Sequence, residues 1–314
     1  MSHDAVLRGD ALEAVLPTSL LERCSVLRGR PRQVTELNGG LTNRNFKITT
    51  PDGVYVLRLS SVASLELAVN RDHEHRNTVL AGETGVGAPV FDYLPEDSVL
   101  VIGYLEGTTF TDESFAEPGN VARAAAAVRR LHDGPRFVCD FNMFDIQAGY
   151  LAKVVARGYK LPAGYLDFAG HVERLRGALA VRDEGTVACN NDLLAGNFID
   201  TGDEIRLIDY EYSGNNDACF ELGNIWSECH LADDQLDELV TAYYGERLGN
   251  RIARARLQAL MSQYGWTLWA SIQDATSSID FDFWSWGLEK YERAVATFTS
   301  PAFDQLLELV QRAD

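Results

Sequence analysis

The chain has 314 residues, a formal net charge of −18 and a pI of about 4.7. Its content of 46% hydrophobic and 10% aromatic residues indicates one large globular domain or two modest ones, and excludes a disordered chain. The acidity argues against a nucleic-acid-binding protein, and it could favour a cationic substrate by long-range attraction.

The N-terminal sequence and the cysteines favour a cytoplasmic protein. Residues 1–16 lack a basic segment followed by an apolar one, and no apolar run is long enough to cross a bilayer. The five cysteines are scattered without a C-x-x-C pair, so neither a zinc site nor a disulfide framework is indicated. We therefore expect reduced thiols and no membrane insertion, and either a monomer or a homodimer.

The first third of the chain has the pattern of a small β-sheet. A leading helix is expected over Ala11–Leu27, and three strands are expected over Gln33–Leu37, Asn45–Thr49 and Val54–Leu59. The third strand carries Arg58. Lys47, on the strand before, is the alternative cation. A helix follows over Leu65–Glu83, and its Glu74 is a candidate partner for Arg58, although a solvated helix face is also possible.

The loop between the first two strands is richer in glycine than a hairpin requires. Paired glycines let backbone N–H groups approach an anion without a Cβ in the way. A plain glycine hairpin is the alternative. We interpret the loop as a nucleotide phosphate loop, with these candidate residues: Gly39, Gly40, Thr42 and Asn43.

A second hairpin and a hinge end the N-terminal region. Val90–Leu94 and Ser98–Tyr104 are predicted strands, and residues 104–107 look like a connection into a second lobe. Backbone groups at such a hinge, including those of Tyr104, are expected to contact a nucleotide base. The expected division is therefore residues 1–106 as a nucleotide-binding lobe and residues 107–314 as a catalytic and acceptor-binding lobe.

The second lobe is predicted to be mainly helical. Its apolar spacing and stop signals predict helices over Asn120–His132, Phe144–Tyr159, Tyr165–Ala180, Ala232–Leu248, Ile252–Ala275 and Phe283–Thr299. Together with the N-terminal strands, these define an α+β fold with a small β-rich N-lobe and a larger helical C-lobe. His132 and His171 are expected to be structural or surface residues.

The most informative stretch is Thr186–Glu228. Asp192 and Asn197 form D-x-x-x-x-N after a short apolar run, and a turn and a second apolar run end at Asp209. Single polar loop residues in a hairpin would be ordinary, but the parts occur here in a fixed order. The arrangement resembles the catalytic loop and metal-binding aspartate of the protein-kinase-like fold. No P-loop or Rossmann motif competes with this interpretation.

Six blocks in order resemble the choline/ethanolamine kinase branch of the aminoglycoside-phosphotransferase-like superfamily. They are NGGLTNRNF (Asn38–Phe46), VLRL (Val56–Leu59), RLHDGPRF (Arg130–Phe137), NNDLLAGNFI (Asn190–Ile199), IDYEYSGNNDACFELGNIWSE (Ile208–Glu228) and WTLWASIQ…SSIDFDF (Trp266–Phe283). The resemblance implies an ATP- and Mg²⁺-dependent kinase. Asp192 would be the catalytic base, Asn197 and Asp209 would hold Mg²⁺, and Arg58 would neutralise phosphates beside Glu74.

The resemblance also implies an acceptor site for a cation. Its members would be Tyr212, Glu228, Trp266, Trp269 and Trp286. A trimethylammonium group has no N–H to donate, so aromatic faces and a carboxylate are a suitable lining. Aromatic residues three apart on a helix are otherwise more typical of a core. Choline is the leading acceptor.

Two alternatives stay open. The acceptor could be ethanolamine, an aminoglycoside or an amino sugar, because Asp274, Asp280 and Asp282 lie near the tryptophans in the sequence. A nucleotide-binding pseudokinase is the third possibility, since Asn190 stands where the family usually has histidine. Asn190 can still hydrogen-bond, so we expect activity.

Overall fold

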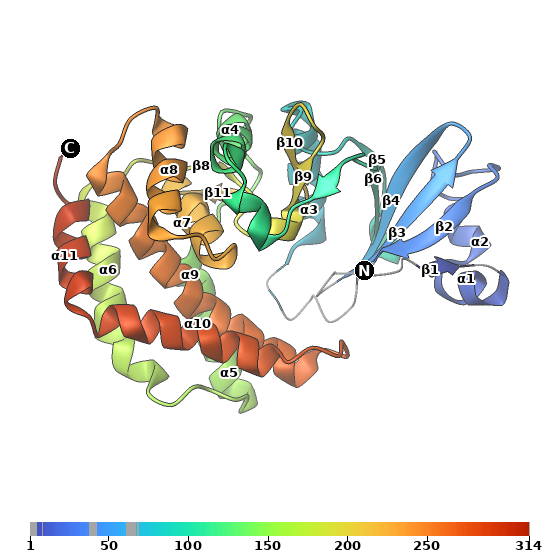
Figure 1. Ribbon diagram of the computed structural model, residues 1–314. Helices are drawn as coiled ribbons and strands as arrows, with labels where there is room; N and C mark the ends of the chain where they lie inside the picture. The colour runs from blue at the N-terminus through green and yellow to red at the C-terminus, as the bar shows by residue number, and fades with distance from the viewer. Residues whose placement is uncertain (1–4, 8, 38–42, 61–66, 68, 314) are drawn as a thin grey trace.

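The computed structural model describes residues 5–7, 9–37, 43–60, 67 and 69–313. The chain forms two lobes, a β-rich N-lobe and a larger helical C-lobe, as the sequence predicts (Figure 1). Helix α3 and the short strands β9 and β10 lie between the sheet and the helical lobe in this view. The proposed boundary between residues 106 and 107 remains a prediction.

The N-lobe is built on a six-stranded antiparallel sheet with strand order β1-β2-β3-β4-β6-β5. Alternating apolar residues of its central strands face a core that includes Phe46, Ile48 and Leu57. The turn at residues 51 and 52 fixes the register of β3 against β4, in which Asn45 lies opposite Arg58. The strands are β1 (Ala5–Leu7), β2 (Gln33–Leu37), β3 (Asn43–Thr50), β4 (Gly53–Ser60), β5 (Val90–Leu94) and β6 (Val99–Gly103).

The leading helix predicted over Ala11–Leu27 is wrong as a single element. The chain forms α1 (Gly9–Val15) and α2 (Thr18–Leu21), which are separated at Pro17. Proline cannot donate a backbone hydrogen bond inside a helix, so it starts a new helix here instead of continuing the first. Leu16 and Leu21 still pack against the sheet.

Helix α3 (Arg71–Glu83) begins later than Leu65, the residue predicted from the sequence. Asn70 caps the helix, and its side chain accepts a hydrogen bond from the backbone N–H of His73 at 3.1 Å. Residues 65, 66 and 68 lie outside the described part of the chain. The cap fixes the position at which Glu74, in the first turn, enters the space between the lobes.

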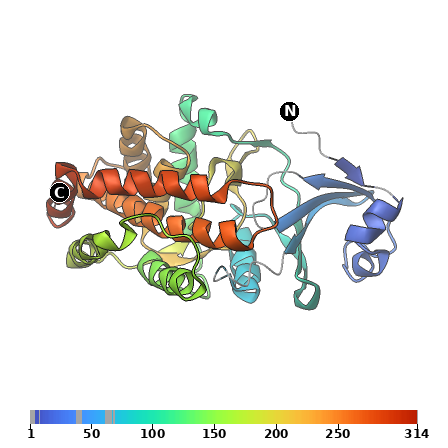
Figure 2. The same cartoon turned by 90° about the horizontal axis from the view of Figure 1, so that it is seen from below.

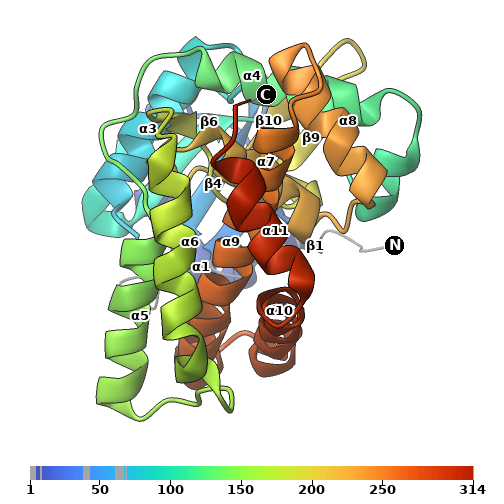
Figure 3. The same ribbon diagram turned by 90° about the vertical axis from the view of Figure 1, so that its left-hand side faces the viewer.

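Most of the C-lobe helices pack against α9, which is buried along most of its length, whereas α4 packs on α8. In Figure 3, α6 and α11 lie toward the viewer, and Figure 2 shows the α9–α10 connection pointing toward the β-rich lobe. A Cβ on Gly223 would collide with the backbone of Ala255, so glycine allows α7 to pack closely on α9. The helices are α4 (Asn120–His132), α5 (Met143–Arg157), α6 (Ala169–Val181), α7 (Ala218–Glu228), α8 (Asp233–Tyr244), α9 (Gly249–Thr276), α10 (Phe283–Phe298) and α11 (Pro301–Val310).

Two small sheets hold the polar segments of the C-lobe. Strand β9 (Phe198–Asp200) pairs with β7 (Thr108–Thr109) and β10 (Ile205–Leu207), and β8 (Val187–Cys189) pairs with β11 (Gly214–Asn216). The predicted D-x-x-x-x-N loop therefore leaves β8 and ends at β9. Among the helices of the described residues, none combines the length and apolar character needed to cross a membrane. Short 3-10 helices in the described part of the chain include Pro95–Asp97, Asp112–Ala116, Tyr165–Phe168 and Ala195–Asn197.

Candidate active site

A cavity of about 390 Å³ lies between the lobes. Its apolar walls come from both lobes and include Val56 and Ile102 on the sheet and Leu207 on β10. Four of the residues singled out from the sequence line the same cavity: Arg58, Tyr104, Asn197 and Asp209. A cavity lined both by apolar side chains and by charged and amide groups suits a nucleotide, whose base is apolar and whose phosphates are anionic.

Arg58 lies at the charged end of this cavity and is almost fully buried. Its guanidinium forms ion pairs with Glu74 of α3, as predicted, and with Asp209 of the C-lobe, where Nη2 lies 2.6 Å from Oδ1. Burial lowers the pKa of Arg58, but the carboxylates of Asp209 and Glu74 more than offset this, so the net pKa is raised. Arg58 therefore stays positively charged, and it lies next to the C-lobe segment that carries Asp209.

A second arginine, Arg71, extends this charge network. Its Nη1 lies 2.5 Å from Glu74 Oε2 and 3.2 Å from Glu211 Oε2, and its Nη2 donates to Asn43 Oδ1 at 3.0 Å. Asn43 in turn donates to Glu211 at 2.9 Å. The network ties the start of β3 to the segment after Asp209.

Only some of the other residues predicted to act in the N-lobe belong to the described part of the chain. Gly39, Gly40 and Thr42 lie outside the described residues. Lys47, the alternative cation, places its ammonium 3.7 Å from the ring centroid of Tyr104 and does not line the cavity. Of the two candidates, Arg58 is the cation beside the C-lobe carboxylates.

Asn197 and Asp209 provide the oxygen atoms of a candidate metal site. Asn197 Nδ2 donates to the backbone oxygen of Asp192 at 2.7 Å, which leaves the amide oxygen as the atom that can bind a cation. Asp209 has a backbone φ of 64°, a left-handed conformation that non-glycine residues rarely adopt. Amide and carboxylate oxygens that line the same cavity fit Mg²⁺, which prefers hard oxygen ligands.

Asp192 is half-buried at the start of the loop between β8 and β9. Burial raises its pKa well above the usual value, and the nearby carboxylates of Asp209, Glu211 and Glu228 raise it further. The ammonium of Lys290 acts in the opposite direction. Asp192 is thus a carboxylate with increased basicity, which suits a residue that accepts a proton.

Asn190 holds the loop in position through three hydrogen bonds. Its Nδ2 donates to the backbone oxygens of Ile208 at 3.1 Å and Asp209 at 2.9 Å, and its Oδ1 accepts from the Asp192 N–H at 3.1 Å. The side chain therefore links the candidate base to the candidate metal ligand. This accounts for how asparagine can support the loop at this position.

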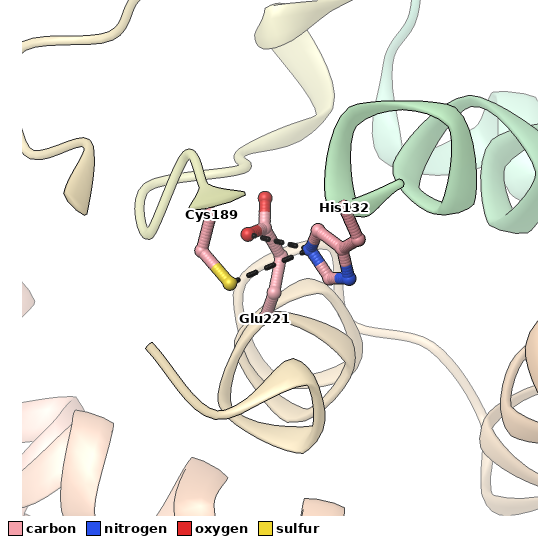
Figure 4. Close-up of side chains that lie close together, drawn as sticks. All are labelled: His132, Cys189 and Glu221. Atoms are coloured by element: carbon pink, nitrogen blue, oxygen red, sulfur yellow. Dashed lines mark hydrogen bonds and ion pairs between the residues drawn. The ribbon is translucent and has the colours of Figure 1, made fainter. Parts of the chain in front are cut away.

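A buried cluster of His132, Cys189 and Glu221 lies behind the same loop (Figure 4). Glu221 accepts the Asn190 backbone N–H through both carboxylate oxygens, at 3.0 and 2.9 Å, and its Oε2 lies 3.2 Å from His132 Nε2. Burial, reinforced by Glu221, raises the Cys189 pKa well above its usual value, so the thiol is protonated. Because Glu221 accepts the Asn190 backbone N–H with both of its carboxylate oxygens, we interpret the cluster as a support for the loop.

The residues predicted to bind the acceptor do lie together. The ring of Trp266 lies 5.0 Å from that of Tyr212 and 6.5 Å from that of Trp269, and Trp269 lies 5.4 Å from Trp286. Trp269 Nε1 also donates to Tyr212 Oη at 2.7 Å. These four residues form a contiguous group, which we call the aromatic box, although all four also pack within the C-lobe core.

Glu228 distinguishes the aromatic box from an ordinary apolar core. Its carboxylate is buried and forms an ion pair with Lys290 of α10, whose ammonium lies 4.0 Å from the ring centroid of Trp286. Burying two charges in an aromatic cluster carries a large desolvation penalty, so such a pair seldom serves packing alone. The carboxylate of Glu228 and the ammonium of Lys290 therefore lie beside the aromatic box.

Several of these residues were missed in the sequence. Glu221 lies seven positions before Glu228, on the same face of α7, and Lys290 lies four positions after Trp286, on the same face of α10. Both spacings were available as signals. Arg71 and Glu211 offered no comparable signal, because their contact depends on how the two lobes meet.

The fold and this constellation define a bilobal enzyme of the phosphotransferase type. Residues 33–260 match the phosphotransferase enzyme family, also called APH. The chain is similar to a crystal structure of a choline/ethanolamine kinase family protein from Mesorhizobium loti, at 32% identity and a TM-score of 0.82, covering 93% of this chain and 97% of the other.

Two further relatives agree with this match. Protein LicA of Haemophilus influenzae is 28% identical over 257 residues, which is 75% of this chain and 72% of LicA. Ethanolamine kinase 1 of Mus musculus is 22% identical over 308 residues, covering 84% of each chain. The protein belongs to the phosphotransferase enzyme family, within its choline/ethanolamine kinase branch, and is an alcohol-directed small-molecule kinase.

Proposed function

We propose that the enzyme transfers the γ-phosphoryl group of ATP to the hydroxyl of a small alcohol that carries an ammonium group. Choline is the acceptor that the sequence favours, and ethanolamine is the second candidate. One observation carries the proposal: the loop that holds Asp192 is hydrogen-bonded to both parts of the candidate site. Asn190 joins it to the backbone oxygen of Asp209 at 2.9 Å, and Asn191 joins it to the backbone oxygen of Tyr212, in the aromatic box, at 3.1 Å.

In this proposal the N-lobe binds and neutralises the nucleotide. The base would occupy the apolar part of the cavity, and Arg58 would face the phosphates at its charged end. Glu74 holds the Arg58 guanidinium from the opposite side, which limits its rotation. Residues 39, 40 and 42 remain predicted phosphate contacts.

Asn197 and Asp209 would hold Mg²⁺. When bound, the metal would supply charge neutralisation to the phosphate oxygens during transfer. Asp209 forms an ion pair with Arg58 in this structure, so its carboxylate lies at the end of the cavity where the phosphates would bind. The carboxylate and amide donors of these two residues match the preference of Mg²⁺.

Asp192 would orient the acceptor hydroxyl and take its proton. The raised pKa makes it a better base than an ordinary aspartate once it is ionised. Asn190 and Glu221 hold its loop from behind, which limits the motion of the carboxylate. The aromatic box would hold the ammonium of the acceptor through cation–π contacts and the Glu228 charge.

The wider alternatives have less support. An aminoglycoside or amino sugar would need directed carboxylates, but Asp274 is ion-paired with Lys160 at 2.9 Å and Asp282 caps α10 by accepting from Ser285 N–H at 2.9 Å. A pseudokinase would be expected to have a disordered or altered loop. The hydrogen bonds of Asn190 argue against that.

The proposal is tested by ADP release from the purified protein with ATP and Mg²⁺. Release should depend on added choline or ethanolamine and should fall to background in Asp192→Ala. Release that does not depend on either amine would contradict the proposed acceptor class.

A further inference from the structure

Lys290 makes the contacts that an acceptor ammonium would be expected to make. Its Nζ is the hydrogen-bond donor to Glu228 Oε2, and it lies 4.0 Å from the centroid of the Trp286 ring. The residue is only 5% exposed. An ammonium of the protein thus already uses one oxygen of the carboxylate and one ring of the aromatic box.

The other oxygen of Glu228 is in a different situation. Oε1 is buried and has no hydrogen-bond partner among the residues that the structure describes, and the same holds for the indole N–H of Trp266. A buried acceptor without a donor costs free energy, and the cost is larger for a charged group. Among the described residues, Glu228 Oε1 therefore has no N–H group that donates to it.

The two head groups of the proposed acceptor class differ in this respect. A primary ammonium can donate an N–H to Glu228 Oε1, and such a charge-assisted bond would help to offset its repulsion from Lys290. A trimethylammonium group has no N–H and depends on aromatic faces, one of which Lys290 already occupies. It is also bulkier, in a box whose rings are nearly all buried.

We propose that Lys290 is a specificity-determining residue that shifts the acceptor site away from trimethylammonium alcohols and toward alcohols with a primary ammonium. This inference rests on the proposed function and selects between its two candidate acceptors. Lys290 leaves Glu228 Oε1 as the part of the box that recognises the acceptor, and recognition through that oxygen requires an N–H.

The test compares kcat/KM for ethanolamine and for choline in the native enzyme and in Lys290→Met, which keeps the length of the side chain and removes its charge. The native enzyme should prefer ethanolamine by about tenfold or more, as expected when a binding site loses a hydrogen-bonded group of its substrate. The variant should lose most of this preference. A native preference for choline, or an unchanged ratio in the variant, would overturn the inference.

Lys160→Met is the matched control. Lys160 also lies over a tryptophan ring, at 5.2 Å from Trp284, and also pairs with a carboxylate, Asp274, but its side chain is 58% exposed and lies outside the box. This variant should keep the native ratio. A shift as large as that of Lys290→Met would assign the effect to general charge and contradict the inference.

Lys290→Met leaves Glu228 buried without its partner, so it could fail to fold. The double variant Glu228→Gln with Lys290→Met removes both charges together and should also lose the preference for ethanolamine. If it retains the native preference, the inference is wrong. Phosphorylation of neither amine by the native enzyme would instead show that the proposed function fails, and the inference with it.

Discussion

Arg58 Nη2 donates to Asp209 Oδ1 over 2.6 Å, and this ion pair joins strand β4 of the N-lobe to the segment that follows β10 in the C-lobe. The cation expected to face the phosphates and the carboxylate expected to hold the metal are therefore partners in the protein alone. Nucleotide phosphates would give Arg58 a further partner of opposite charge, and a metal ion would do the same for Asp209. In the proposed function, the pair would thus link the relative position of the lobes to nucleotide binding.

Arg58→Ala should reduce both stability and activity. It leaves Glu74, which is 3% exposed, buried beside fewer cations, and breaking a buried ion pair costs about 3–5 kcal/mol. We expect kcat/KM for ATP to fall on the order of 10²-fold, because one group that stabilises phosphate charge is lost. Chemical denaturation and steady-state kinetics measure the two effects.

The control is Arg44→Ala on the neighbouring strand. Arg44 pairs with Glu36 at 2.7 Å, but its side chain is 47% exposed, so the loss should be about 0–1 kcal/mol. A similar loss of activity in both variants would show that Arg58 acts only through the stability of the sheet.

Asp192→Asn should abolish turnover and stabilise the protein near neutral pH. Burial raises the pKa of Asp192 in the folded state, so its contribution to stability is present below the pKa of the unfolded chain and is lost as pH rises through the folded value. Asparagine carries no charge and avoids this loss. We expect turnover to fall about 10³-fold and Tm to rise at pH 7 in protein free of nucleotide and metal.

The Tm difference between Asp192→Asn and the native protein should shrink as pH is lowered toward the ordinary pKa of aspartate. A variant that is less stable than the native protein at pH 7 would contradict the electrostatic account of Asp192.

Asn190→Ala should lower kcat because it releases the Asp192 loop. The three hydrogen bonds made by Asn190 are lost, and backbone groups that they satisfy are left without partners, at about 1–3 kcal/mol. Asn142→Ala is a control of comparable stability loss, about 1 kcal/mol, since Asn142 caps α5 by accepting from Phe144 N–H at 2.9 Å. Equal losses of kcat in the two variants would show that Asn190 acts only through the stability of the fold.

Trp266→Ala should raise KM for the acceptor much more than KM for ATP, because its ring contacts Tyr212 and Trp269 rather than the nucleotide cavity. Trp284→Ala removes a tryptophan in the first turn of α10 that contacts Lys160 outside the box, so it should leave KM for the acceptor near the native value. Equal effects of Trp266→Ala on both KM values would assign Trp266 a packing role.

The strands of the N-lobe could be predicted from the sequence because neighbouring residues alone define them. Alternating apolar residues and the turn at Pro51–Gly53 define β3 and β4. In the C-lobe, the fixed spacing from Asp192 to Asn197 and Asp209 likewise marks the candidate catalytic loop. The single helix expected over Ala11–Leu27 failed because the apolar spacing was given more weight than Pro17.

The ion pair and hydrogen bonds around the candidate acceptor site could not be predicted from neighbouring residues. Glu228 and Lys290 are 62 positions apart, and their ion pair exists only because α7 and α10 both pack on α9. The role of Glu221 likewise depends on β8 passing next to α7. Side chains that meet only through packed helices leave little trace in sequence spacing.

The central claim is tested most directly by a panel of acceptors offered to the purified enzyme with ATP and Mg²⁺, with the phosphorylated products identified by mass spectrometry. The account predicts phosphorylated choline or ethanolamine with the native enzyme, no such product with Asp192→Ala, and no product from kanamycin-type sugars. Turnover of those sugars without turnover of either amino alcohol would contradict it.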